Sequence, residues 1–180
     1  MNYVYEFTNK RKVTKKEFIH WFEKKFLYTL RKFNMTEKGD LIVVENKGDF
    51  RGVVLKHLMT MFAEKAPVKI AESGKGKCRK YTKIAVTATT DTEAERITNI
   101  LVKGNADALN ELKPANNKVI KPLFLFLDKE VILYAKLMGL KFKAVKERKD
   151  RLSVFVNDME KKHPEIKHSI VKSFLELYQE

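Results

Sequence analysis

The chain has 180 residues, of which 44% are hydrophobic and 11% aromatic, as is typical of one folded domain. Lysine and arginine number 37 against 23 acidic residues, so the net charge is +14 and a polyanionic partner such as nucleic acid is favoured. A single cysteine excludes an internal disulfide, and without a long apolar run or a secretory signal we expect a cytoplasmic protein with no membrane association.

A basic segment and a helix open the chain. Thr14 followed by Glu17 matches a helix-capping box, S/T-x-x-E. We expect residues 1–38 to form a basic N-terminal segment and a lead-in helix that ends before Gly39. Apolar side chains recur at every fourth position and predict the buried stripe of this helix: Phe18, Phe22, Phe26 and Leu30.

Strands and helices alternate in the middle of the chain. The unbroken apolar run Leu41–Val44 predicts a buried central strand of a parallel sheet. The segments PVKIAE, YTKIAVTA and KVIKPL predict three further strands. Helices are predicted at Val53–Phe62, at Thr92–Val102 with a cap at Thr89, Thr90 or Asp91, and from the cap Asp128 to Met138.

Two helical patterns close the chain, Leu152–Lys161 and Ile166–Tyr178, after a basic stretch that begins at Lys141. The alternation of strands and helices predicts an α/β fold with a mostly parallel sheet. We expect the sheet and its helices to occupy residues 39–140, and a C-terminal helical pair to occupy 141–180.

Four blocks of sequence carry a family resemblance: EFIHWFEKKFLYTLRKFNMTEKGDLIVV, YTKIAVTATTDTEAERITNILVKGN, VIKPLFLFLDKEVILYAKLMGLKF and FVNDMEKKHPEIKHSIVKSFLEL. In this order they resemble the TtuA-type tRNA 2-thiolation proteins of the PP-loop ATP pyrophosphatase superfamily. The blocks cover most of the chain. The resemblance implies a PP-loop type of α/β sheet and a link to tRNA thiolation.

The chain departs from this family at the phosphate loop, S-G-G-K-D-S, of which it keeps only Gly48. Such loops turn backbone N–H groups toward an anion at a helix N-terminus. Asp49 would place negative charge beside pyrophosphate, and Phe50 replaces a lysine donor, although Arg51 could still meet an anion. We name these six residues the remnant loop: Lys47, Gly48, Asp49, Phe50, Arg51 and Gly52.

The cluster and metal chemistry of the family also lacks its residues here. The resemblance implies an iron–sulfur cluster on three cysteines and zinc on cysteine/histidine clusters, whereas this chain has only one cysteine, Cys78. Asp91 and Thr92 replace a double aspartate, so one Mg²⁺-phosphate ligand is lost. We therefore expect no metal and no cofactor. Cys78 is either a reactive thiol activated by its basic neighbours or an ordinary loop cysteine.

Basic residues in three stretches predict an RNA-binding surface. Trp21, Tyr28 and Tyr81 are candidates for stacking on exposed bases, with packing in the protein as the alternative. The predicted RNA-binding residues are Lys10, Arg11, Lys12, Lys15, Lys16, Lys24, Lys25, Arg31, Lys32, Lys75, Lys77, Arg79, Lys80, Lys83, Lys141, Lys143, Lys146, Arg148, Lys149 and Arg151.

Together these features favour a shortened, non-catalytic relative of the thiolases. It would bind tRNA or another structured RNA, or pair with a catalytic thiolase subunit. One alternative is an ATP-dependent tRNA-modifying enzyme with an atypical phosphate loop. Another is a homodimeric scaffold that does not contact RNA.

Overall fold

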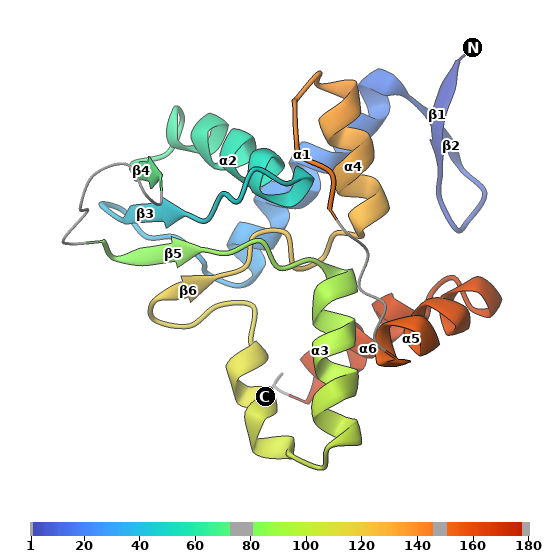
Figure 1. Ribbon diagram of the computed structural model, residues 1–180. Helices are drawn as coiled ribbons and strands as arrows, with labels where there is room; N and C mark the ends of the chain where they lie inside the picture. The colour runs from blue at the N-terminus through green and yellow to red at the C-terminus, as the bar shows by residue number, and fades with distance from the viewer. Residues whose placement is uncertain (1, 73–80, 146–150, 178–180) are drawn as a thin grey trace.

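The computed structural model describes residues 2–72, 81–145 and 151–177, and Figure 1 traces its elements. In chain order these are β1 (Tyr3–Glu6), β2 (Lys12–Thr14), α1 (Lys15–Lys32), β3 (Leu41–Val44), α2 (Phe50–Ala63), β4 (Lys69–Glu72), β5 (Lys83–Ala85), α3 (Thr90–Val102), the 3₁₀ helix η1 (Ala106–Leu112), β6 (Val119–Ile120), α4 (Asp128–Leu137), α5 (Arg151–Lys162) and α6 (Ile166–Glu176).

The central sheet confirms the predicted α/β fold class. Its four strands lie in the order β4-β3-β5-β6, and every neighbouring pair is parallel. The run Leu41–Val44 forms β3, which lies inside the sheet between β4 and β5, as predicted. Ile42 and Val44 are fully buried, because helices cover this part of the sheet.

Helices α1, α2 and α4 pack with the sheet in the main hydrophobic core. The ring of Phe22 in α1 stacks on that of Tyr134 in α4, with centroids 4.3 Å apart. At the start of α1, the carboxylate of Glu17 accepts hydrogen bonds from the backbone N–H and the hydroxyl of Thr14. The stripe predicted for this helix is buried throughout: Phe18, Phe22, Phe26 and Leu30.

Helices α3, α5 and α6 form a second group, at the lower right of Figure 1. Apolar side chains of α3, η1 and α6 make a separate cluster around Phe124, Ile97 and Phe174. The C-terminal pair is therefore docked on α3.

A buried ion pair joins α3 to the end of β6. The Nζ atom of Lys121 lies 2.6 Å from Oε2 of Glu93 and 2.8 Å from the backbone oxygen of Leu112. The two charged side chains are only 4% and 0% exposed. Burial lowers the pKa of Lys121, and the charge of Glu93 opposes this shift.

The antiparallel hairpin of β1 and β2 was not predicted from the sequence. This hairpin covers Trp21, whose ring contacts those of Tyr5, Phe7 and Phe18. Of the two alternatives given for Trp21, stacking on RNA bases or packing in the protein, the structure shows packing.

The predicted cap of α4 is wrong by one residue. Leu127 is the N-cap, and Asp128 begins the helix. The reason is that the carboxylate of Glu130 accepts the N–H of Leu127, while the Asp128 carboxylate is bound by Arg51 and Thr89.

Within the three described ranges, no helix is long and apolar enough to cross a bilayer.

Candidate functional site

The strand order places a topological switch point between β3 and β5. The chain leaves β3 through α2 toward β4 on one side, and leaves β5 through α3 toward β6 on the other. Ligands of open parallel sheets bind outside the carboxyl ends of the strands at such a point. Here the carboxylate of Glu45 occupies this position and accepts the hydroxyl of Thr87 at 3.3 Å and its N–H at 3.4 Å.

The remnant loop follows directly and is closed by the side chains of Asn46, just before it, and of Asp49 within it. Gly48 has a left-handed backbone (φ +79°), and its N–H donates to Oδ1 of Asn46 at 2.9 Å. Asp49 is the N-cap of α2 and accepts the N–H of Gly52 at 2.8 Å. A Cβ atom at Gly52 would come within 2.8 Å of Asn46 Oδ1 and 3.1 Å of Asp49 Oδ1. Side-chain oxygens of the protein thus fill the space beside the first turn of α2.

Arg51 is held by carboxylates. From the sequence, this residue could still have met an anion. Its guanidinium forms a bidentate pair with Asp128, and Nε donates to Oδ1 at 2.8 Å. A second nitrogen of the guanidinium, Nη1, lies 3.9 Å from Oδ2 of Asp49. Burial would lower the pKa of Arg51, but the hydrogen bond to Asp128 and the charges of the surrounding aspartates together raise it. Arg51 therefore ties α2 to α4.

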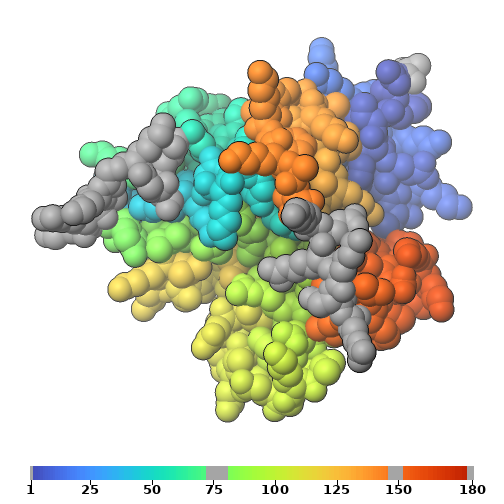
Figure 2. All heavy atoms as spheres, viewed as in Figure 1, coloured from blue at the N-terminus to red at the C-terminus, as the bar shows by residue number. Residues whose placement is uncertain are grey.

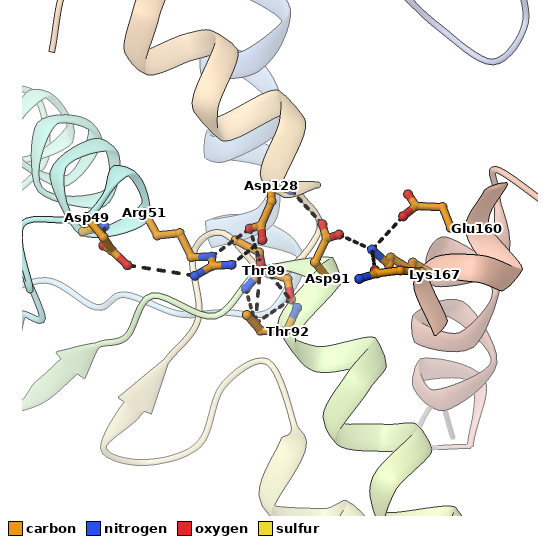
Figure 3. A network of polar contacts seen from close by, with 10 residues as sticks. Asp49, Arg51, Thr89, Asp91, Thr92, Asp128, Glu160 and Lys167 are labelled. Carbon is orange, nitrogen blue, oxygen red and sulfur yellow. Dashed lines mark hydrogen bonds and ion pairs between the residues drawn. The ribbon is translucent and has the colours of Figure 1, made fainter. Parts of the chain in front are cut away.

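The network continues from this pair to the C-terminal helices (Figure 3). Thr89, the N-cap of α3, donates to Asp128 at 2.8 Å, and Asp91 accepts the N–H of Asp128 at 2.7 Å. The other oxygen of Asp91 pairs with Lys167 of α6 at 2.6 Å, and Lys167 also pairs with Glu160 of α5 at 2.7 Å. The N-terminal ends of α2, α3 and α4 are thereby linked to α5 and α6.

The residues at the switch point do not fit ATP. Four carboxylates lie there, on Glu45, Asp49, Asp91 and Asp128, and they accept the hydrogen bonds that a phosphate would need. Nor does the chain fit a cluster held by several cysteines, since it has one cysteine, Cys78, which lies outside the described residues. Within residues 2–72, 81–145 and 151–177, no group of three histidine, cysteine or acidic side chains could hold a metal ion.

The cap at Asp49 leads to a first prediction. Asp49→Ala should lower the free energy of unfolding by about 1 kcal/mol, because the N–H of Gly52 loses its acceptor. Urea unfolding measures this difference. Asp49→Ser retains a capping oxygen and should cost only a few tenths of a kcal/mol. Equal losses in both variants would contradict a capping role.

Two of the predicted RNA-binding lysines pair with carboxylates inside the protein, Lys25 half-buried and Lys83 buried. Lys25 lies 3.1 Å from Glu130, its side chain is 19% exposed, and its ammonium packs over the rings of Trp21 and Phe126. Lys83 pairs with Asp40 at 3.0 Å and its side chain is 8% exposed. An ammonium satisfied inside the protein is not available to a phosphate.

The other predicted cations divide into two groups. Seven lie outside the described residues, Lys75, Lys77, Arg79, Lys80, Lys146, Arg148 and Lys149, as does the side chain of Arg151. Ten are exposed, and we name them the exposed basic set: Lys10, Arg11, Lys12, Lys15, Lys16, Lys24, Arg31, Lys32, Lys141 and Lys143.

The segment after α4 packs against the remnant loop, as Figure 2 shows for the orange and cyan atoms. The N–H of Lys143 donates to the backbone oxygen of Gly48 at 2.8 Å. Its side-chain carbons run past Gly48, at 3.6 Å from a Cβ atom built there. Lys47 in the same loop is exposed and pairs with Glu45 at 2.8 Å. Sequence reasoning had placed these two lysines in separate features.

Comparisons with known proteins bear on the fold. No family model matches the chain, and no curated protein matches it. Among solved structures, the U34-tRNA thiolase NcsA from Methanococcus maripaludis, with its 4Fe–4S cluster, is similar with a TM-score of 0.76. The similarity covers 97% of this chain and 84% of that chain at 17% sequence identity. The chain therefore shares the fold of that structure, in agreement with the resemblance drawn from the sequence.

Proposed function

We propose that this chain is a non-catalytic, RNA-binding relative of the tRNA thiolases, with tRNA or another structured RNA as its ligand. A catalytic thiolase subunit is the protein partner that this role suggests, because it would supply the chemistry that the chain lacks. The cytoplasm is the proposed compartment.

One observation carries the non-catalytic part of the proposal. The carboxylate of Asp49 accepts the N–H of Gly52 at the first turn of α2, where a phosphate-binding loop would offer its donors to an anion. The neighbouring cation, Arg51, already has Asp128 as its bidentate partner. A phosphate entering this site would have to displace one carboxylate and approach another.

Charge and exposure support the RNA-binding part. The chain carries a net charge of +14, and the exposed basic set includes Lys24, Arg31 and Lys32 on α1. This helix has 18 residues and so extends about 27 Å, long enough to follow several phosphates of an RNA strand. Neutralising phosphates with lysine and arginine releases counterions and drives such binding.

Calorimetric titration with Mg²⁺-ATP tests the non-catalytic part. We expect no binding heat up to millimolar nucleotide, because the remnant loop is closed by Asn46 and Asp49. A dissociation constant well below millimolar would support the alternative of an ATP-dependent enzyme with an atypical loop.

A further inference from the structure

A polar hollow opens at the edge of the sheet opposite the remnant loop. Its volume is about 450 Å³, and its walls come from the segments that precede β3, β5 and β6 together with the end of α1. The amino ends of these strands lie at the left of Figure 1. Neither the predicted nucleotide site nor the comparisons account for this hollow.

The floor of the hollow carries more negative than positive charge. Lys83 is paired with Asp40 at 3.0 Å and with Glu37 at 3.2 Å, so two carboxylates face one ammonium. The Glu37 side chain is 80% exposed at the surface of the hollow. Such a floor disfavours a phosphate, and it favours a neutral group that presents N–H donors.

The walls offer the hydrogen-bonding groups that read a nucleobase. Three exposed asparagines line the hollow, Asn34, Asn116 and Asn117, and the amide oxygen of Asn116 already accepts the backbone N–H groups of Lys118 and Val119. An amide provides both donors and acceptors, as the edges of bases do. The ring of Phe33 forms a further part of the wall and is half-buried. Tyr81, at the same edge of the sheet, exposes 44% of its surface, and aromatic rings of this kind stack on unpaired bases.

Exposed cations adjoin the lining residues of the hollow along the chain. Arg31 and Lys32 end α1 directly before Phe33, and the ammonium of Lys32 lies 5.6 Å from the centre of that ring. Lys118 follows Asn117 along the chain and is exposed. A polar, slightly negative hollow inside a basic rim matches a base that turns inward while its neighbouring phosphates stay outside.

We propose that this hollow binds one unpaired base of the RNA, with the adjacent phosphates on Arg31, Lys32 and Lys118. The inference rests on the proposed RNA-binding function and adds a preference for unpaired over paired RNA. Fully paired RNA cannot deliver a base to the hollow, so it should bind through charge alone.

The test uses the full chain, with a short single-stranded RNA and a blunt RNA duplex as probes. The variant Asn34→Gly/Asn117→Ala removes two amides without changing the charge, and glycine accepts the left-handed backbone of position 34 (φ +47°). We expect its affinity for the single strand to fall roughly tenfold, from the loss of base-edge hydrogen bonds. Affinity for the duplex, and the salt dependence of both, should stay unchanged.

The matched control is Asn99→Ala/Asn110→Ala, which removes two exposed amides from α3 and η1. It should bind both probes like the wild type. If the two double variants bind the single strand equally well, the hollow is not a base site, although RNA binding itself stands. If the wild type binds neither probe at low salt, the proposed RNA function fails, and the base site fails with it.

Discussion

Replacing Lys24, Arg31 and Lys32 together by glutamine should weaken tRNA binding on the order of 100-fold near physiological salt. All three residues are exposed on α1. Each cation that contacts a phosphate contributes through counterion release, so the loss should grow as salt is lowered. The slope of log affinity against log salt should decrease by about one unit for each contact removed. Fluorescence anisotropy with labelled tRNA at several salt concentrations measures both quantities.

A control variant removes the same amount of charge elsewhere. Lys161, Lys162 and Lys172 are exposed on α5 and α6, and changing them to glutamine also subtracts three positive charges. Two of them are already paired, Lys161 with Asp158 and Lys172 with Glu176. We expect this variant to lose much less affinity and little slope. Equal losses in both triple variants would mean that net charge, rather than the α1 surface, attracts the RNA.

Glu93→Ala should be the most destabilising single change, with a loss of about 3–5 kcal/mol in the free energy of unfolding. Among the described contacts, the substitution leaves the buried ammonium of Lys121 with the carbonyl of Leu112 as its acceptor. Taking an ammonium out of water without a counter-charge is costly. For a chain of this length, the loss corresponds to a fall of roughly 10 °C in Tm.

Two further variants test whether the destabilisation comes from leaving a buried charge unpaired or simply from removing a charge. Glu93→Leu/Lys121→Met removes both charges and should recover most of the stability, because no unpaired ion stays buried. Arg96 is the outer partner of Glu93, and the Arg96 side chain is 59% exposed. Arg96→Ala should therefore lower the free energy of unfolding by less than about 1 kcal/mol. If Glu93→Ala is as mild as Arg96→Ala, the ion pair does not stabilise the fold as we describe.

Local patterns in the sequence predicted the elements well. The stripe from Phe18 to Leu30 and the apolar run of β3 each depend on neighbours a few residues apart, which periodicity detects. The hairpin of β1 and β2 was missed because its strands are only 4 and 3 residues long. Short strands of this kind give almost no periodic signal.

The candidate site was harder to predict because its partners are distant in the sequence. Lys25 was expected on the RNA surface, yet its partner Glu130 is 105 residues away, and no local rule connects them. The same holds for Arg51 and Asp128, which are 77 residues apart. One signal was available and went unused: an aspartate three residues before Gly52, at the start of an apolar helix, is a helix-capping pattern.

Thermal unfolding, followed by the fluorescence of Trp21, tests the central claim most directly. Trp21 is the only tryptophan of the chain and packs beneath the β1–β2 hairpin, so its emission reports on the protein and not on the melting of RNA. A ligand present at 100 times its dissociation constant should add about 2.7 kcal/mol to the free energy of unfolding. We expect tRNA at low salt to raise Tm by roughly 5–10 °C, and Mg²⁺-ATP to leave it unchanged. If Mg²⁺-ATP raised Tm and tRNA did not, the result would contradict the account of an RNA-binding protein whose nucleotide site is closed.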